Sequence, residues 1–312
     1  MKAQLHIVDI LDSTDFSRGL KQLSNAHLLF GMFHGKELKT INELSFSNHI
    51  PVVYALPTLT SPVSGNQYFI LGSATLRSHC EYLFEYVYRR HFGDRVLLVG
   101  RKQVAQEMEV LSYFQSLNQK KTEAGLYPLP WIVFQDTGRL ALRNLADSLS
   151  HLLTNVVILA SNDAQFINSI MHHLSKHAEK SIKLIGMPGW RTLERISPSL
   201  LDSFDCLIST SFFYERTDSA VQHFRNNYQA RFLVPPSEHA LRGYDHGKYF
   251  GNQLAQFGRW MLGVFPPPAS PPVASVFKVV PVMQGENVLY RENKGVFLLR
   301  YTQGKWQRFS GS

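Results

Sequence analysis

The histidines in "MHHLSKH" are the side chains best spaced for chemistry in this sequence of 312 residues. His173 and His177 stand four residues apart, so on a helix they share one face, as two ligands of a metal site would. The motif itself holds no carboxylate or cysteine to complete the set. We interpret it as a solvated polar helix face, with adventitious metal binding as the alternative, and expect no metal site and no cofactor.

Motifs that carry enzymatic chemistry are missing from the sequence. It contains no G-x-S-x-G elbow, no G-x-x-x-x-G-K-[ST] phosphate loop, no G-x-G-x-x-G after a predicted strand and no H-E-x-x-H. We therefore expect a protein that is not an enzyme.

The formal charge of +8 raises the question of nucleic-acid binding. Nucleic-acid binders usually gather Lys and Arg on one stripe between stacking aromatic residues. Here the basic pairs are scattered: Arg89-Arg90, Arg101-Lys102 and Lys120-Lys121 each fall near the end of a predicted element. This pattern indicates a solvated basic surface and no nucleic-acid partner, and it leaves open a weak attraction to anionic partners.

Length and composition indicate a folded protein of two domains. With 44% hydrophobic residues the chain can bury a large core, and its apolar runs, such as "NVVILA", are too short to span a bilayer, so we expect no membrane insertion. The opening residues show no signal peptide. Cys80 and Cys206 lie far apart in the sequence and are expected to be free, buried thiols.

Short apolar runs alternate with amphipathic stretches, an order that predicts an α/β fold with parallel sheets. The first predicted strands are "QLHIVDI", "HLLFGMF" and "IPVVYAL", with helices "DFSRGLKQLSN" and "KELKTINELSFSN" between them. After the loop "PTLTSPVSGNQ" and the helix "LRSHCEYLFEYVYRRHF" come the strands "RVLLVG", "WIVFQ", "NVVILAS", "IKLIGM" and "CLISTSFF", again separated by helical stretches. Their Val, Ile and Leu content is typical of strands covered on both faces.

In the last third of the chain the predicted strand–helix alternation ends. Residues 237–258 predict one long helix, and "FPPPASPPV" cannot continue it. The remaining residues alternate apolar and polar side chains with Gly at the turns, which predicts a tail of β-hairpins. We expect this tail to join the second domain and the hinge region.

Between residues 213 and 250 the sequence resembles the type I periplasmic-binding-protein family, which includes the branched-chain amino acid binding proteins of ABC transporters. The segment "FYERTDSAVQHFRNNYQARFLVPPSEHALRGYDHGKYF" carries the resemblance through its helix with Phe224 and Tyr228, its loop with Pro235 and Pro236, and Ala240 followed by Gly243-Tyr244-Asp245. "GMFHGKE" and "IPVVYALPTLTSP" are similar to loops and strands of the first lobe. The tail "YRENKGVFLLRYTQGKW" resembles the closing hairpin of Bacteroidetes-type versions.

The resemblance implies two Rossmann-like lobes with parallel sheets, joined by a hinge. We expect residues 1–73 and 236–275 to form the first lobe, and residues 74–235 and 276–312 to form the second lobe. The family has a strand and a helix ahead of the strand that "QLHIVDI" resembles, and this sequence has no segment for them.

Loops that follow strands supply the candidate ligand contacts, because crevices in such sheets lie at the carboxyl ends of the strands. The candidates are His34, Gly35, Thr58, Thr60, Ser61, Arg101, Asp136, Thr137, Ser161, Asn162, Trp190, Phe213, Tyr214 and Glu215. For any single one of them, an ordinary solvated loop residue is the favoured interpretation. Together they suit a small polar or zwitterionic ligand.

Gly243, Tyr244 and Asp245 interrupt a predicted helix, and we interpret them mainly as a structural junction. Gly243 would allow a close approach, Tyr244 would pack its ring against the sheet, and Asp245 would accept hydrogen bonds from loop amides. Direct contact with a ligand is the alternative.

Two functions remain open. The first is a solute-binding protein that holds an amino-acid-like ligand in a cleft between its lobes, for transport or sensing, with a membrane transporter as partner. The second is a cell-envelope scaffold of the same fold that contacts other envelope proteins, such as a regulator of peptidoglycan synthesis. The resemblance implies the periplasm or an association with the outer membrane.

Overall fold

A computed structural model describes residues 23–135 and 139–310, together with Gly19. The chain forms two compact units and passes between them three times. Unit 1 comprises Met1–Thr75 and Ser211–Gly295, and unit 2 comprises Leu76–Thr210 and Val296–Ser312. Each unit is built around one sheet, so the units are described in turn.

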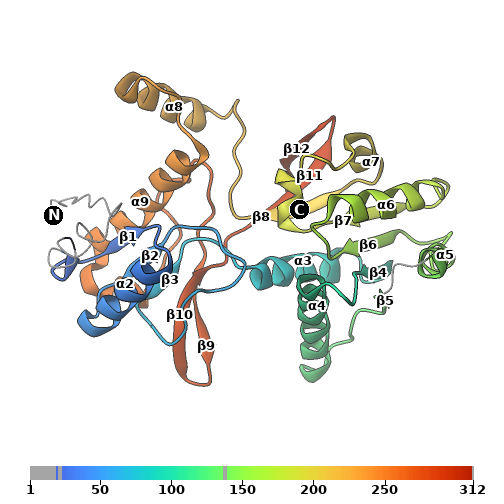
Figure 1. Ribbon diagram of the computed structural model, residues 1–312, viewed down its shortest axis with the longest axis horizontal. Coiled ribbons are helices and arrows are strands. Elements are labelled where there is room, and N and C mark those ends of the chain that lie inside the picture. The colour runs from blue at the N-terminus through green and yellow to red at the C-terminus, as the bar shows by residue number, and fades with distance from the viewer. Residues whose placement is uncertain (1–18, 20–22, 136–138, 311–312) are drawn as a thin grey trace. The chain divides into compact units, whose positions relative to one another are not determined.

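Unit 1 contains a five-stranded sheet in the order β1-β2-β3-β10-β9 (Figure 1). The strands are β1 (Leu29–Gly31), β2 (Val52–Tyr54), β3 (Phe69–Leu71), β9 (Val279–Gln284) and β10 (Asn287–Asn293). The pairs β1–β2, β2–β3 and β3–β10 are parallel, and β9 is antiparallel to β10. A sheet of this kind needs apolar cover on both faces.

Alternation along β2 and β3 provides that cover in unit 1. Val52, Tyr54, Phe69 and Leu71 join a core with Ile41 of α2. The intervening residues Val53 and Ile70 join a second core with Tyr249 and Phe250 of α9. Helices α2 (Gly35–Asn48) and α9 (Glu238–Phe257) therefore pack on opposite faces, because successive strand side chains point to opposite sides. Helix α8 (Ser219–Phe232) belongs to the same unit.

Unit 2 contains a seven-stranded sheet in the order β12-β11-β8-β7-β6-β4-β5. The strands are β4 (Arg95–Val99), β5 (Trp131–Phe134), β6 (Asn155–Leu159), β7 (Ile182–Ile185), β8 (Leu207–Thr210), β11 (Phe297–Thr302) and β12 (Lys305–Arg308). The strands from β8 to β5 are parallel, and β11 is antiparallel to β8 and β12. All five residues of β6 are buried, as expected for a central strand.

Five of the described α-helices belong to unit 2; the first leads from β3 of unit 1 into β4, and the others connect successive parallel strands. They are α3 (Leu76–Arg90), α4 (Ala105–Glu123), α5 (Arg139–Asp147), α6 (Ala164–Ser175) and α7 (Pro198–Ser203). Two short 3-10 helices complete the described elements, η1 (Pro188–Thr192) in unit 2 and η2 (Gly258–Gly263) in unit 1. The predicted α/β class with two parallel-dominated sheets is confirmed.

The predicted lobe boundaries were wrong in two segments. Residues 276–295 lie in unit 1, because β10 pairs with β3, while only β11 and β12 of the tail pair with β8 of unit 2. Residues 211–235 also belong to unit 1, where Val221 packs with Leu241. Strand β3 was not predicted at all, and the predicted strand "QLHIVDI" lies outside the described residues.

Cys80 and Cys206 are both free and buried, as expected. Burial raises the pKa of the Cys80 thiol to about 12, so it stays protonated and unreactive at neutral pH. Among the helices that the structure describes, none combines the length and the apolar character needed to cross a bilayer.

Candidate functional site

In unit 2, the carboxyl ends of three neighbouring strands bring together four of the predicted contact residues. Arg101 follows β4, Ser161 and Asn162 follow β6, and Trp190 follows β7. Arg101 Nη2 lies 3.4 Å from Ser161 Oγ, and Trp190 Nε1 donates to the Ser161 carbonyl at 2.6 Å. Parallel pairing thus places these loops at one sheet edge.

Arg101 is the centre of a charged network at this edge. Its guanidinium donates to both Glu107 oxygens at 2.5 to 3.1 Å and to Asp163 at 2.8 Å. It also lies 4.4 Å from the centre of the Phe166 ring. Glu107 is buried and is held further by the Arg101 amide at 2.7 Å. The guanidinium is therefore fixed in position by two carboxylates and one ring.

The network carries a net negative charge at neutral pH. Hydrogen bonding to Glu107, and secondarily to Asp163, raises the pKa of Arg101 above its ordinary value. The hydrogen bond from Arg101 lowers the pKa of Asp163. Two carboxylates then face one guanidinium, so the edge favours an ammonium group over a carboxylate.

Trp190 lies in the core of unit 2. Its side chain is 1% exposed, and its indole N–H is already bonded to Ser161. A Cβ at Gly186 would lie 2.4 Å from the indole ring, so only glycine lets the ring turn inward there. The position of Trp190 after β7 in the sequence does not predict whether its side chain points into the core or out of it.

Asn162 offers an acceptor at the same edge. Its Oδ1 is buried and has no hydrogen-bond partner among the described residues. A Cβ at Gly189 would lie only 2.6 Å from this oxygen, so the glycine leaves room beside it. A buried carbonyl oxygen without a donor is costly, and a ligand N–H would relieve that cost.

In unit 1, the predicted loop residues after β1 and β2 are largely engaged with their own loops. Thr58 Oγ1 donates to the Thr60 carbonyl at 2.6 Å, and Ser61 Oγ donates to the Val63 carbonyl at 2.5 Å. His34 is exposed at the start of α2, where its amide donates to Glu37. Gly35 has a φ of 47°, which favours glycine at the start of this helix.

A cation that sequence reasoning missed lies at the carboxyl end of β3. Arg242 Nη1 donates to Ser73 Oγ at 3.2 Å, and its guanidinium lies 4.3 Å from the centre of the Phe212 ring. His246, one turn later on α9, approaches the Gly72 carbonyl at 2.8 Å. Position after a strand does not predict Arg242, because this residue lies on a helix.

The Gly-Tyr-Asp segment includes one strong structural contact. The Asp245 carboxylate accepts three hydrogen bonds, from the amides of Val273, Ala274 and Ser275, at 2.7, 2.7 and 2.8 Å. Asp245 is 2% exposed, so it holds the strand-like residues 273–275 against α9. These are the loop amides that the junction interpretation required.

The other two residues of that segment differ from the prediction. A Cβ at Gly243 would meet nothing within 4 Å, so no close approach requires glycine there. Tyr244 is 43% exposed and contacts Phe224 of α8 at 4.7 Å between ring centres, with the rings tilted by 48°, and not the sheet. The helix faces α8 at this point, which explains the different partner.

The remaining candidates divide into buried, exposed and undescribed residues. Phe213 is buried and its amide donates to the Ala274 carbonyl, so it belongs to the core. Tyr214 is half-buried against Phe212, and Glu215 is exposed. Asp136 and Thr137 lie outside the described residues.

The two histidines predicted to share a helix face do lie close together. His173 and His177 have ring centres 5.9 Å apart, and His177 Nδ1 lies 3.8 Å from Glu179. Within the described part of the chain, no cluster of three His, Cys, Asp or Glu residues is arranged to hold a metal.

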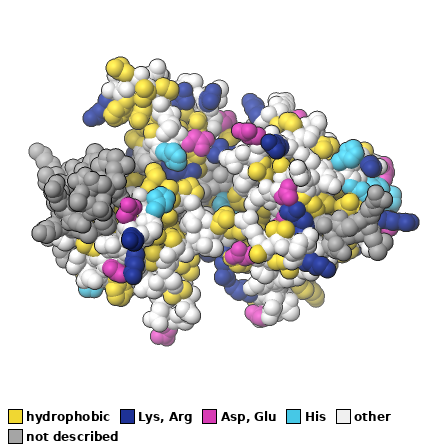
Figure 2. All heavy atoms as spheres, viewed as in Figure 1, with side chains coloured by type: hydrophobic (Ala, Val, Ile, Leu, Met, Phe, Trp, Pro, Cys, Tyr) yellow, Lys and Arg dark blue, Asp and Glu magenta, His cyan; other side chains and the backbone are white. Residues whose placement is uncertain are grey.

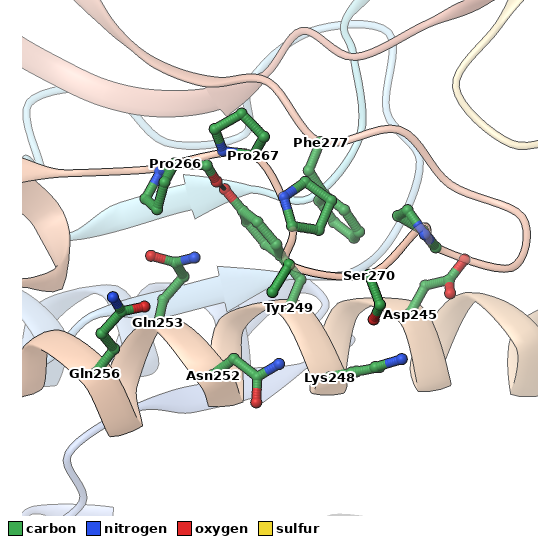
Figure 3. A pocket seen from close by; sticks show the side chains of 13 residues that line it. Asp245, Lys248, Tyr249, Asn252, Gln253, Gln256, Pro266, Pro267, Ser270 and Phe277 are labelled. Atoms are coloured by element: carbon green, nitrogen blue, oxygen red, sulfur yellow. Dashed lines mark hydrogen bonds between the residues drawn. The ribbon is translucent and has the colours of Figure 1, made fainter.

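Unit 1 also contains a small cavity between α9 and the proline-rich loop, shown in Figure 3. Its volume is about 70 Å³, and its lining includes Tyr249, Gln253, Pro266 and Phe277. The Tyr249 hydroxyl closes one end by donating to the Pro266 carbonyl at 3.1 Å. Since ligand pockets usually measure about 300–1,000 Å³ and a water occupies about 30 Å³, this space suits ordered water.

No protein-family model matches this sequence, and no curated protein matches it in sequence. Solved structures do match its fold. A putative branched-chain amino acid ABC transporter protein from Rhodospirillum rubrum has a TM-score of 0.61 at 13% identity, over 96% of this chain and 85% of that chain. A branched-chain amino acid ABC transporter periplasmic ligand-binding protein from Burkholderia xenovorans LB400 has 0.59 at 12%, over 95% and 80%.

An ABC transporter substrate-binding protein from Desulfitobacterium hafniense, in complex with Leu, gives a TM-score of 0.56 at 14% identity over 96% of this chain and 86% of that chain. Identities this low establish shared architecture and not shared function. The chain therefore has the type I periplasmic-binding-protein fold, as its sequence resemblance implied.

Proposed function

We propose that this chain is a non-enzymatic solute-binding protein whose two units close on a small, amino-acid-like ligand. The observation that carries the proposal is the opposite character of the two strand-end edges. Unit 1 has the Arg242 guanidinium beside Ser73, and unit 2 has the Asn162 acceptor beside the net negative Arg101 network.

A zwitterion matches these two edges chemically. A guanidinium and a hydroxyl are suitable donors for a carboxylate, and Arg binds carboxylates in a planar, two-pronged geometry. The Asn162 oxygen and the Asp163 carboxylate are suitable acceptors for an ammonium group. Closure by hinge rotation would bring both sets of groups to one ligand.

The structural neighbours support the same proposal. The Desulfitobacterium protein is in complex with Leu, and the Rhodospirillum and Burkholderia proteins are described as parts of branched-chain amino acid transporters. For this chain we propose an amino acid ligand, a partner transporter in the membrane and a place in the cell envelope. The absence of catalytic motifs from the sequence agrees with a protein that binds and releases its ligand unchanged.

Equilibrium dialysis against a mixture of the 20 common L-amino acids tests this function without prior choice of ligand. Wild-type protein should retain one chemical group of amino acids, measured by chromatography of both chambers. Arg242→Met keeps an apolar stem over Phe212 but loses the cation, and Asn162→Ala loses the acceptor. Each should weaken retention about 10- to 100-fold, the usual effect of losing a hydrogen bond to a charged group.

Leu152→Ser is the matched control, because Leu152 is 96% exposed in unit 2 and should retain wild-type binding. No retention by folded wild-type protein would contradict the proposal. That outcome would favour the second candidate, an envelope scaffold that contacts other proteins.

A further inference from the structure

The outer half of α8 exposes a contiguous apolar tip. Phe232, Leu233 and Val234 follow one another in the chain and are 53%, 85% and 52% exposed. Leu233 ends the helix in the left-handed region, with φ 60° and ψ 12°. Consecutive exposed side chains of this size are unusual on a soluble surface, where apolar residues normally occur singly.

The tip continues a stripe that packs the inner half of α8 onto its own unit. Val221 is fully buried, and the Phe224 ring contacts that of Tyr244 on α9 at 4.7 Å between ring centres. Tyr228 and Phe232 follow at four-residue spacing on the same face, with their ring centres 4.6 Å apart. In Figure 1, α8 extends away from the sheet of unit 1, so the stripe runs outward beyond the unit's core.

Basic side chains flank this stripe on both sides. Arg225 and Arg231 each stand three residues from Tyr228, one before and one after it, which places them on opposite edges of the stripe. The Arg231 guanidinium lies 5.6 Å from the centre of the Phe232 ring. Figure 2 shows hydrophobic atoms with Lys and Arg atoms beside them over α8.

No acidic residue balances these cations locally. Asp218 and Glu238 bound the segment, but no Asp or Glu lies between them, and within the described residues neither Arg225 nor Arg231 forms an ion pair. The whole chain carries a formal charge of +8. The partner of this surface should therefore be anionic and able to accept apolar side chains.

We propose that the α8 tip, defined as Arg225, Tyr228 and Arg231–Val234, binds the surface of an anionic lipid bilayer. An anionic lipid interface supplies both kinds of contact, because it carries negative headgroups and deforms around apolar side chains. Aromatic and aliphatic side chains enter the boundary between headgroups and acyl chains, while arginines remain at the anionic headgroups. The contact is peripheral, and it would hold the protein at a membrane without a spanning helix.

Co-sedimentation with vesicles tests this proposal on the full chain. We expect binding to vesicles of phosphatidylcholine with about 30% phosphatidylglycerol, and little binding to phosphatidylcholine alone, because each cation near an anionic surface contributes about fivefold in affinity. Raising NaCl from about 0.05 to 0.5 M should weaken binding, since the Debye length falls several-fold.

Leu233→Ser should reduce the affinity about tenfold or more, because it removes a large apolar side chain from the interface. The double variant Arg225→Gln/Arg231→Gln should reduce it about 25-fold, at roughly fivefold per cation. Leu152→Ser, at a leucine of unit 2 that is 96% exposed, should bind vesicles as wild type does. Thermal melts should show that all variants remain folded.

Three results would overturn the proposal. One is the absence of binding to anionic vesicles, and another is binding that Leu233→Ser leaves unchanged. The third is a dimer in sedimentation velocity that Leu233→Ser dissociates, since a second copy would then cover the tip. None of these measurements involves an amino acid ligand, so they are independent of the solute-binding test.

Discussion

At the scale of single residues, buried charges in this protein hold backbone segments in place. Asp245 is the clearest case, because one carboxylate accepts three amide hydrogen bonds and joins α9 to residues 273–275. Arg101 does the same for the loops of unit 2 through Glu107 and Asp163. Each such group is costly to bury alone, and its hydrogen bonds offset that cost.

Asp245→Asn should lower the free energy of unfolding by about 2–4 kcal/mol. Asparagine loses the negative charge and turns an N–H₂ group toward amides that are themselves donors. Asp218→Asn is the control, because Asp218 caps α8 at an exposed position and Asn caps helices equally well. Urea unfolding measures both, and equal stability of the two variants would contradict the role assigned to Asp245.

Two buried histidines should make stability depend on pH. Burial lowers the pKa of His79 and of His246 to about 4, whereas both return to about 6.5 on unfolding. The unfolded chain then binds more protons, so stability is full above pH 6.5 and declines as the pH falls toward 4. At pH 5 the loss should be roughly 2 kcal/mol per histidine.

Urea unfolding at pH 7.5 and pH 5 measures this loss. His79→Asn and His246→Asn should each show a smaller difference between the two pH values than wild type does, whatever their stability at pH 7.5. A wild-type stability that is the same at both pH values would contradict the assignment.

At the scale of elements, the sequence did not predict which strands pair when the partners lie far apart in the chain. The hairpins of the tail were predicted from their alternation, but the partners of each hairpin were not, because a strand pattern does not name its neighbour. Strand β3 was not predicted because it has only three residues and follows "SGNQ", whose composition is typical of a loop. The long strands of unit 2 were predictable because continuous Val, Ile and Leu runs identify strands buried on both faces.

The same limit applies to the candidate site. Position after a strand correctly grouped Arg101, Ser161 and Asn162 at one sheet edge. It could not show that the Trp190 ring turns into the core, since that depends on space beside Gly186. It also could not find Arg242, which reaches the end of β3 from a helix distant in sequence.

Two glycines of unit 1, one open to a Cβ and one in close contact with backbone, should respond oppositely to substitution by alanine. Gly243→Ala should stabilise unit 1 by about 0.5–1 kcal/mol, because the position is helical and open to a Cβ. Gly295→Ala should destabilise it by several times that amount, because the Cβ would lie 2.2 Å from the Val276 carbonyl oxygen. Thermal unfolding compares the two, and a loss of stability in Gly243→Ala would indicate a close contact that α9 does not show.

At the scale of the whole molecule, a single chain builds two sheets and crosses between the units three times. Segments far apart in sequence complete each sheet, β10 in unit 1 and β11 in unit 2. Each unit nevertheless keeps a sheet and a core of its own. The proposed function assigns donors to one unit, at Arg242 and Ser73, and acceptors to the other, at Asn162 and Asp163.

The most direct test of the central claim is the thermal unfolding midpoint of the full chain with each of the 20 common L-amino acids at about 10 mM. If the chain binds such a solute, one chemical group of amino acids should raise the midpoint. A ligand at 100 times its dissociation constant adds about 2.7 kcal/mol. Arg242→Met should lose the shift and Leu152→Ser should keep it. A midpoint that no amino acid raises, in protein that unfolds cooperatively, would contradict the account.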